Sequence, residues 1–449
     1  MTNVIKLKKG LDINLKGKPQ EKMLTAAKSD YFVMVPDDFY GVVPKVVVKA
    51  GDKVLAGTPL MFDKNRPEIK FVSPVSGEVT AVERGERRKV LGITVKKDET
   101  NSFVEFGKKE VSKISAEDIK TLMLESGVWP FIKQRPYDVI ADPRIAPRDI
   151  FVSAFDSAPL APEFEFVAKN EQAAIQAGLD ALKKLTKGKV YVGVRPGSAV
   201  KMQGVEVVTI EGPHPAGNAG VQAHNIKPVN KGETIWTLSA FDLVIIGRLF
   251  TKGVADFSRI VAVTGSEIST PAYVNACFGT CLKDLLSNNV VKADYAQRFI
   301  SGNVLSGINT GLDGYLNFYH SQITVIPDGS DNDEFVGWAL PGLAKYSTTR
   351  TYLTWLFGGK KEYTIDARLR GGKRALIVSG QFEKFFPMDI YPEFLYKATL
   401  AFDIDKMENL GIYEVAPEDF AVCEFVDVSK TEIQKVIRLG LDRLQKEMN

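Results

Sequence analysis

Short runs of alternating apolar and polar residues, broken by glycine, fill the chain between residues 31 and 100. Val46–Leu60 and Phe71–Val95 each contain valine-rich runs of this kind, which are typical of β-strands with one buried face. Gly51 and Gly77 interrupt the runs, and glycine readily adopts the positive φ that tight hairpin turns need. Two such halves predict a barrel-sandwich hybrid domain, the shape of lipoyl and biotinyl carrier domains.

A carrier domain of this shape holds its cofactor on a lysine at an exposed hairpin tip. We expect the tip within Phe62–Pro67, where the lysine is Lys64. Its neighbours, Asp63 and Asn65, form neither the Met-Lys-Met nor the Asp-Lys-Ala triplet that a carrier needs. We therefore interpret Lys64 as an ordinary surface lysine, with a carrier function as the minor alternative.

Helical and strand patterns alternate after about residue 112. Ser115 and Asp118 have the spacing of a helix-capping box, and Glu171–Leu185 carries an apolar stripe at helical spacing. Buried strands are expected at Ile150–Ala154, Lys189–Val194 and Val205–Ile210. Strand, helix and strand in this order favour a parallel sheet with crossover helices.

The two ends of the chain have weaker patterns. Residues 1–30 form a lead-in with two short expected strands, Val4–Leu7 and Asp12–Leu15, whereas Ile260–Pro327 indicates a compact α+β unit. The C-terminal part is mostly helical, and its clearest expected segments are the helices Met388–Ala401 and Thr431–Lys446 and the apolar strand Ala421–Val426.

Composition narrows the possible classes of protein. A chain of 449 residues predicts about three domains, and shares of 45% hydrophobic and 25% charged residues are ordinary for a soluble protein. A net charge of +3 gives no basis for binding nucleic acid. No apolar run reaches the roughly 18 residues that span a bilayer. Three cysteines indicate a reducing compartment, so we expect a cytoplasmic protein that reaches a membrane only through partners.

The residues that usually hold metals or clusters are few. An iron–sulfur cluster needs about four thiolates at set spacings, but Cys277 and Cys281 have no second pair and Cys423 lies alone in an apolar run. The histidines are scattered, at His214, His224 and His320. We therefore expect no metal site and no cluster.

Three long segments carry a family resemblance. They are Glu125–Pro162, Gly212–Gly253 with the motif GPHPAGNAG, and Ser379–Val428 with the motif MDIYPEFLYKA. Through them the chain resembles, over nearly its whole length, the NqrA family, the A subunits of the bacterial Na+-translocating NADH:quinone reductases. It is more distantly similar to the C subunit of the Rnf complex and to the flavin-binding subunit of respiratory complex I.

The resemblance implies an α/β multidomain fold with a Rossmann-like domain and a β-grasp domain of the soluble-ligand-binding (SLBB) kind. The expected order is a lead-in (1–30), the barrel-sandwich hybrid (31–100), the Rossmann-like domain (101–259), the β-grasp domain (260–345) and a mostly helical C-terminal domain (346–449).

Departures from the distant relatives concern their cofactors. Those relatives cradle the FMN phosphate in a glycine-rich loop, but Gly127–Phe131 here contains bulky rings and a proline without an N–H. Gly212–Gly220 has three glycines without the spacing of a nucleotide-binding loop. Their cysteine motifs are missing from Ser379–Phe382 and Pro387–Ile390. We therefore expect no flavin and no iron–sulfur cluster on this chain.

A quinone ring needs a flat apolar slot and donors for its two carbonyl oxygens. One part of the chain offers both, and its candidate quinone-binding residues are Trp129, Phe131, Arg135, Tyr137, Phe155 and Asp156. The alternative is that these rings only pack a proline-rich segment against the sheet.

The resemblance implies a peripheral subunit on the cytoplasmic face of the cell membrane, without a transmembrane helix. In such a complex, flavins and an iron–sulfur cluster on partner subunits carry electrons from NADH to ubiquinone, while membrane-embedded partners move Na+. This chain is then expected to act at the quinone site or in assembly, with no catalytic residue of its own. The alternatives are a purely structural docking module and a soluble flavoprotein dehydrogenase subunit.

Overall fold

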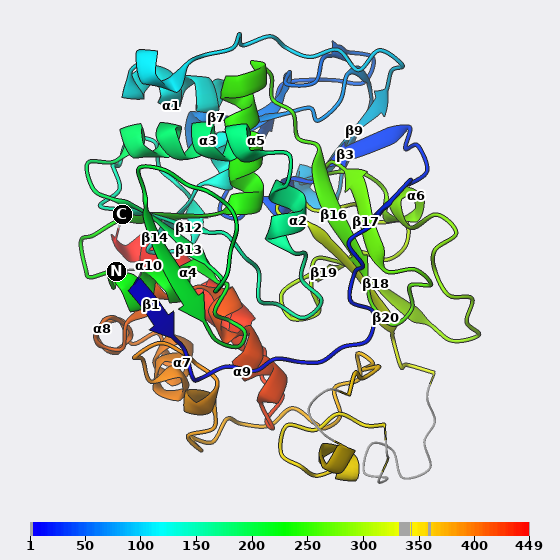
Figure 1. Cartoon of the computed structure of the whole chain (residues 1–449), viewed down its shortest axis with the longest axis vertical. Coiled ribbons are helices and arrows are strands. Elements are labelled where there is room, and N and C mark those ends of the chain that lie inside the picture. Colours follow the sequence, from blue (N-terminus) through cyan, green and yellow to red (C-terminus); the bar gives the residue numbers. More distant parts are fainter. Residues whose placement is uncertain (1–2, 332–341, 343, 358–360, 449) are drawn as a thin grey trace.

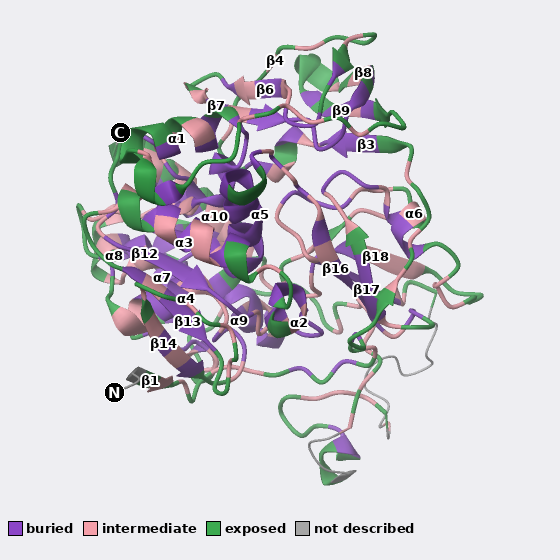
Figure 2. Ribbon diagram, turned by 45° about the horizontal axis from the view of Figure 1, so that its top comes forward, coloured by how far each residue is buried: buried purple, intermediate pink, exposed green. Residues whose placement is uncertain are grey.

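The computed structural model describes residues 3–331, 342, 344–357 and 361–448. Their strands form four sheets, with helices packed between and around them (Figure 1). Buried residues concentrate where helices cover the largest sheet (Figure 2). Residues 332–341 and 343, which belong to the predicted β-grasp domain, lie outside the described residues.

Two small sheets form the unit between residues 31 and 97, as the glycine-broken pattern predicted. Their strands are β3 (Tyr31–Met34), β9 (Val90–Lys97), β8 (Gly77–Arg84) and β5 (Lys53–Val54) in one sheet, and β4 (Pro44–Val46), β6 (Pro59–Asp63) and β7 (Arg66–Val72) in the other. Lys64 is exposed at the tip of the β6–β7 hairpin. Beside it, the buried Asp63 accepts a hydrogen bond from Arg66 Nε at 3.0 Å and fixes the turn.

A seven-stranded sheet forms the centre of the molecule. Its order is β1 (Asn3–Lys6), β14 (Glu206–Glu211), β13 (Val190–Val194), β12 (Ile150–Ser153), β15 (Ile235–Ser239), β10 (Lys133–Arg135) and β11 (Val139–Ile140). The first five strands are parallel, which confirms the predicted parallel sheet. At the far edge β10 is antiparallel to β15, and β11 is antiparallel to β10. The predicted capping box is also confirmed, because Ser115 Oγ accepts the N–H of Asp118 at 3.1 Å.

Helices cover both faces of this sheet because alternate strand residues are apolar on both sides. The helices are α1 (Ala116–Glu125), α2 (Phe164–Ala168), α3 (Gln172–Leu185), α4 (Ala219–Ile226) and α5 (Ala240–Lys252). Ile150 and Val152 are buried in the core that contains α3 and α5, whereas Phe151 packs with Ala223 of α4 on the other face. The α3 and α5 helices touch closely: a Cβ on Gly247 would lie 1.7 Å from a backbone oxygen of α3.

The six-stranded sheet lies beside the central sheet (Figure 1). Its order is β19 (Ile308–Asn309), β18 (Gln297–Ser301), β20 (Gln322–Pro327), β16 (Arg259–Thr264), β17 (Ala272–Ala276) and β2 (Met23–Leu24), and it packs the short helix α6 (Leu282–Leu286). The lead-in therefore joins two sheets, since β1 pairs with β14 and β2 with β17. The strand predicted at Asp12–Leu15 was wrong, because only Leu15 makes an isolated bridge, to Tyr363.

The C-terminal part is mostly helical, as predicted. Its helices are α7 (Pro392–Ala401), α8 (Ile404–Asn409), α9 (Ala421–Val426) and α10 (Ile433–Met448). The strand predicted at Ala421–Val426 was wrong, since these residues form α9. A six-residue apolar run has no periodicity that separates a buried strand from a buried helix. Here Asp419 Oδ2 accepts the N–H of Ala416 at 2.8 Å and caps the short helix that α9 continues.

A buried carboxylate organises the loop before α7. Glu393 is fully buried, and its two oxygens accept the backbone N–H groups of Ser379, Gly380, Gln381 and Phe382 at 2.7 to 3.4 Å. The hydroxyl of Ser379 donates to it as well, at 3.1 Å. The segment where the distant relatives are expected to carry a cysteine motif is therefore held here by a glutamate.

Candidate functional site

A cavity of about 490 Å³ opens at the carboxyl ends of β12 and β15. Ser153 and Ser239, the last residues of these strands, both line it. The strand order reverses between β12 and β15, because β13 and β14 lie on one side of β12 and β15 on the other. Ligands of open α/β sheets usually bind at such a reversal, outside the carboxyl ends of the strands.

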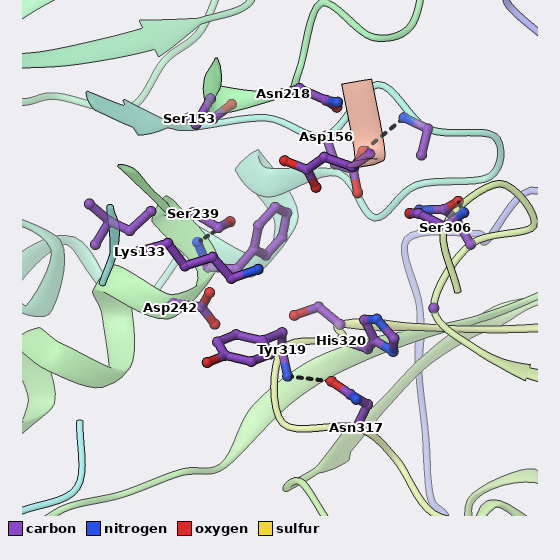
Figure 3. Close-up of a pocket in the computed structure, with 18 of the residues that line it drawn as sticks. Lys133, Ser153, Asp156, Asn218, Ser239, Asp242, Ser306, Asn317, Tyr319 and His320 are labelled. Carbon is purple, nitrogen blue, oxygen red and sulfur yellow. Dashed lines mark hydrogen bonds between the residues drawn. The ribbon is translucent and has the colours of Figure 1, made fainter. Parts of the chain in front are cut away.

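Four parts of the chain build the walls of this cavity (Figure 3). The barrel unit contributes Asp38, and the central sheet contributes Lys133, Asp156 and Asp242 among others. The six-stranded unit supplies a wall with Asn303, Ser306, Tyr319 and His320, and the C-terminal helices supply Glu418, Gln434 and Arg438. Every large part of the described molecule therefore contributes to the lining of the cavity.

Three of the six predicted quinone-binding residues line the cavity, namely Phe131, Phe155 and Asp156. Phe155 and Asp156 follow β12, and burial raises the pKa of the Asp156 carboxyl. Phe131 is also a core residue, since its ring stacks on Phe318 with centroids 4.4 Å apart.

The other three predicted residues point elsewhere. Trp129 is fully buried against Trp236, and its Nε1 donates to the carbonyl of Ala141 at 2.8 Å. Arg135 is buried against the C-terminal helices, where its Nη1 lies 3.1 Å from Asp419. Tyr137 packs at the edge of the C-terminal core. The side chains of residues 129–137 therefore go to three different places: the cavity, the central core and the contact with the C-terminal helices.

Acidic side chains outnumber basic side chains in the lining of the cavity. Among the described lining residues six are carboxylic acids, Asp37, Asp38, Asp138, Asp156, Asp242 and Glu418, and two are cations, Lys133 and Arg438. Asp242 lies in the first turn of α5, 3.3 Å from Arg259. Burial raises the pKa of Asp242 to about 6, although Arg259 acts against the rise. Burial also raises the pKa of Asp38 and that of Glu418 to about 7, so the acids outnumber the cations while only part of them is charged near pH 7.

Sequence reasoning missed several residues that line the cavity, among them Lys133, Asp242 and Tyr319. Lys133 has its Nζ 4.7 Å from the ring centre of Tyr319, whose hydroxyl donates to the carbonyl of Pro130 at 3.0 Å. Asp242 had a usable signal, because it follows a buried strand and begins a helix at the end of a parallel sheet. Tyr319 and His320 had none, since their approach depends on how two separate units pack.

Two histidines line the cavity, and each is bonded to a serine. His214 Nδ1 lies 3.0 Å from Ser157 Oγ, and His320 Nδ1 lies 3.0 Å from Ser301 Oγ. Burial lowers the pKa of His214 to about 4 and that of His320 to about 3, so both imidazoles are neutral near pH 7. The third histidine, His224, lies outside the lining and contacts Glu414 at 2.9 Å.

Metal ligation and membrane insertion find no support in the described part of the chain. No group of three or more His, Cys, Asp or Glu side chains there is placed to hold a metal ion. None of the helices in that part combines the length and the apolar character needed to cross a bilayer.

Known proteins match the chain over its whole length. The A subunit of the Na(+)-translocating NADH-quinone reductase from Yersinia pestis bv. Antiqua (strain Angola) is 35% identical over 99% of this chain and 100% of that protein. Proteins of the same name from Tolumonas auensis and Vibrio anguillarum are 35% and 34% identical over the same shares. The chain belongs to the NqrA family, the A subunits of the Na(+)-translocating NADH-quinone reductases. Three family models agree: the NqrA N-terminal barrel-sandwich hybrid domain matches residues 5–98, the NqrA second alpha/beta domain matches 114–255, and the NqrA C-terminal domain, whose model is named for SLBB, matches 260–311.

The match to the barrel-sandwich hybrid model of NqrA confirms the shape that the glycine-broken pattern predicted for the first domain. Among solved structures, a chain of an NAD+-reducing [NiFe]-hydrogenase in the air-oxidized state superposes with a TM-score of 0.33. The two chains are 12% identical, and the match covers 47% of each. This structural similarity is too weak to support any conclusion about the present chain.

Proposed function

We propose that the cavity at the ends of β12 and β15 binds the ring of a quinone. The observation that carries the proposal is the composition of its walls, in which the rings of Phe131, Phe155 and Tyr319 accompany polar groups. Ligand pockets combine apolar and aromatic walls with a few placed polar groups in this way. An uncharged ring fits this lining better than a flavin or nucleotide phosphate does, because acids outnumber the two cations that could pair with a phosphate.

The proposal extends to the place of the chain in the reductase complex. The relatives are named as one subunit of an NADH-quinone reductase, so we infer partner subunits, some of them embedded in the membrane. Flavins and an iron–sulfur cluster on those partners would carry electrons from NADH, and this chain would hold ubiquinone as a peripheral subunit on the cytoplasmic face. The proposal also includes the division into domains, with boundaries after residues 30, 100, 259 and 345. In it the third domain is Rossmann-like and the fourth is a β-grasp domain.

A docking module is the second candidate function, and one surface favours it. The α7 helix and its start carry exposed apolar side chains at Tyr391, Phe394 and Leu400, which are 63%, 49% and 62% exposed. Exposed apolar groups gathered on one element often mark a protein contact. Binding of partners through α7 and of quinone in the cavity are compatible, because the two regions use different residues.

The quinone proposal predicts a specific loss of affinity when Phe155 is shortened. Phe155→Ala should raise the dissociation constant for ubiquinone-1 by about 10- to 100-fold, since burying one ring contributes roughly 1.5–3 kcal/mol. The measurement is a titration of the purified chain followed by intrinsic fluorescence. Phe151→Ala is the matched control, because Phe151 is a buried ring four residues before Phe155 that stacks on Tyr191 and does not line the cavity. It should lower the melting temperature and leave affinity unchanged. Equal affinities in the two variants would assign Phe155 to packing alone.

A further prediction separates quinone binding from the role of a flavoprotein. The chain purified from its native complex should be colourless and free of iron, because the described cavity lining has only two cations to pair with a phosphate and the described cysteines form no cluster site. The measurements are visible absorbance and iron analysis of the purified protein. A stoichiometric flavin in the cavity would exclude the quinone proposal and support the flavoprotein alternative.

A further inference from the structure

The two cavity histidines share one bonding pattern. Ser157 Oγ accepts the backbone N–H of Gly217 at 2.8 Å, and Ser301 Oγ accepts that of Asn317 at 3.0 Å. Each hydroxyl then has one proton left to donate. In the described part of the chain, the acceptor within reach of that proton is the Nδ1 of the paired histidine.

This pattern favours one tautomer of both rings. A neutral imidazole has one N–H donor and one acceptor nitrogen. With Nδ1 as the acceptor of the remaining serine proton, the proton of each ring is on Nε2. The Nε2 atoms of His214 and His320 have no hydrogen-bond partner among the described residues, and neither is a fully buried orphan atom. Since both rings line the cavity, a ligand there can reach these two N–H groups.

The two donors belong to different walls. His214 is bonded to Ser157, whose sequence neighbour Asp156 lies with Asn218 at one end of the pocket (Figure 3). His320 lies beside Tyr319 at the other end, on the six-stranded unit (Figure 3). A ligand that uses both donors needs an acceptor on each of two edges. A ring with two carbonyl oxygens on opposite edges has this arrangement.

We propose that His214 and His320 donate their Nε2–H groups to the two ring oxygens of the quinone, an assignment that rests on the quinone binding proposed above. The serines act as positioning residues, because each holds one proton on the far nitrogen of its ring. The two histidines thereby select an uncharged ligand with two acceptor oxygens over a ring of the same size without them. They also join two structural units through the ligand, since each unit supplies one donor.

Glutamine and asparagine substitutions test the assignment directly. The amide nitrogen of glutamine has about the reach of Nε2, whereas that of asparagine has the reach of Nδ1. His320→Gln and His214→Gln should therefore keep the affinity for ubiquinone-1 within about threefold of the unmodified chain. His320→Asn and His214→Asn should each weaken it by about 5- to 10-fold, the contribution of one hydrogen bond. Titrations use the purified full chain, and melting temperatures verify that all four variants fold.

A spectroscopic measurement tests the role of the serines. The ring nitrogens of His214 and His320 should show the Nε2–H tautomer in ¹⁵N-resolved NMR spectra of the unliganded chain. Ser301→Ala should remove this preference at His320 and leave His214 unchanged. An Nδ1–H tautomer in the unmodified chain would overturn the assignment.

The outcomes separate this inference from the function on which it rests. If the unmodified chain binds ubiquinone-1 and the glutamine and asparagine variants bind equally, the histidine assignment is wrong and quinone binding stands. If the unmodified chain does not bind ubiquinone-1, both proposals are wrong. If the asparagine variants bind ubiquinone-1 weakly and the glutamine variants keep their affinity, the result supports both quinone binding and the histidine assignment.

Discussion

Replacing Glu393 by alanine should lower the free energy of unfolding of the C-terminal helices by about 3–5 kcal/mol, because it leaves buried donors without an acceptor. Four backbone N–H groups and one hydroxyl converge on this carboxylate, so truncation at Cβ removes the acceptor of all five. The measurement is urea unfolding followed by circular dichroism. Glu432→Ala is the control, since Glu432 pairs with Lys373 and Lys435 at the surface and should change stability by less than about 1 kcal/mol.

The same carboxylate makes the stability depend on pH. Burial acts to raise the pKa of Glu393, but the N–H groups of the 379–382 loop outweigh it and hold the pKa below its ordinary value. The folded form thus binds the proton less readily than the unfolded form. The contribution is fully present above the ordinary carboxyl pKa and is lost as the pH falls through the lower, folded value. Glu393→Gln should remove this acid dependence. An unchanged acid-unfolding curve in that variant would contradict the role.

Replacing Arg135 by alanine should cost about 3–5 kcal/mol of folding free energy, because it leaves Asp419 charged and buried without its partner. Arg135 Nη1 also donates to the carbonyl of Glu414 at 3.2 Å, so this one side chain ties β10 to the C-terminal helices. The measurement is again urea unfolding. Arg144→Ala is the matched control, since Arg144 forms its ion pair with Asp142 at the surface and should contribute at most about 1 kcal/mol.

This substitution also distinguishes a structural arginine from a quinone donor. Both Nη atoms of Arg135 face acidic or carbonyl oxygens of the C-terminal helices, and the residue does not line the cavity. Under conditions where Arg135→Ala stays folded, its ubiquinone-1 affinity should change less than that of Phe155→Ala. A variant of normal stability with a selective loss of quinone affinity would contradict this view.

Local patterns predicted much of the fold because they depend on neighbouring residues. The valine-rich runs of the barrel, the cap at Ser115 and the strands β12 and β13 all follow from sequence spacing, and the structure contains them. The strand predicted at Ala421–Val426 was wrong for the opposite reason, since a six-residue segment with five apolar residues forms a buried helix or a buried strand according to what packs on it.

The sequence predicted cavity-lining residues correctly only where neighbours in the sequence line the same side of the cavity. Phe155 and Asp156 both reach the cavity because they follow one strand into the same loop. Trp129 and Arg135 are close to Phe131 in sequence, but the chain turns between them and each finds a distant partner. No spacing rule could place Arg135 against Asp419 or bring His320 opposite the loop after β12.

Four parts of the chain form the cavity walls, and this has a consequence for the order in which the protein folds. Asn317 bonds Asp38 across 279 residues of sequence, and Arg135 bonds Asp419 across 284. Contacts between such distant residues form late, after the local sheets and helices have already gained their shape. A newly made chain can therefore contain every folded part and still have no binding site. Binding of a quinone ring would then indicate that all four parts of the chain have packed together.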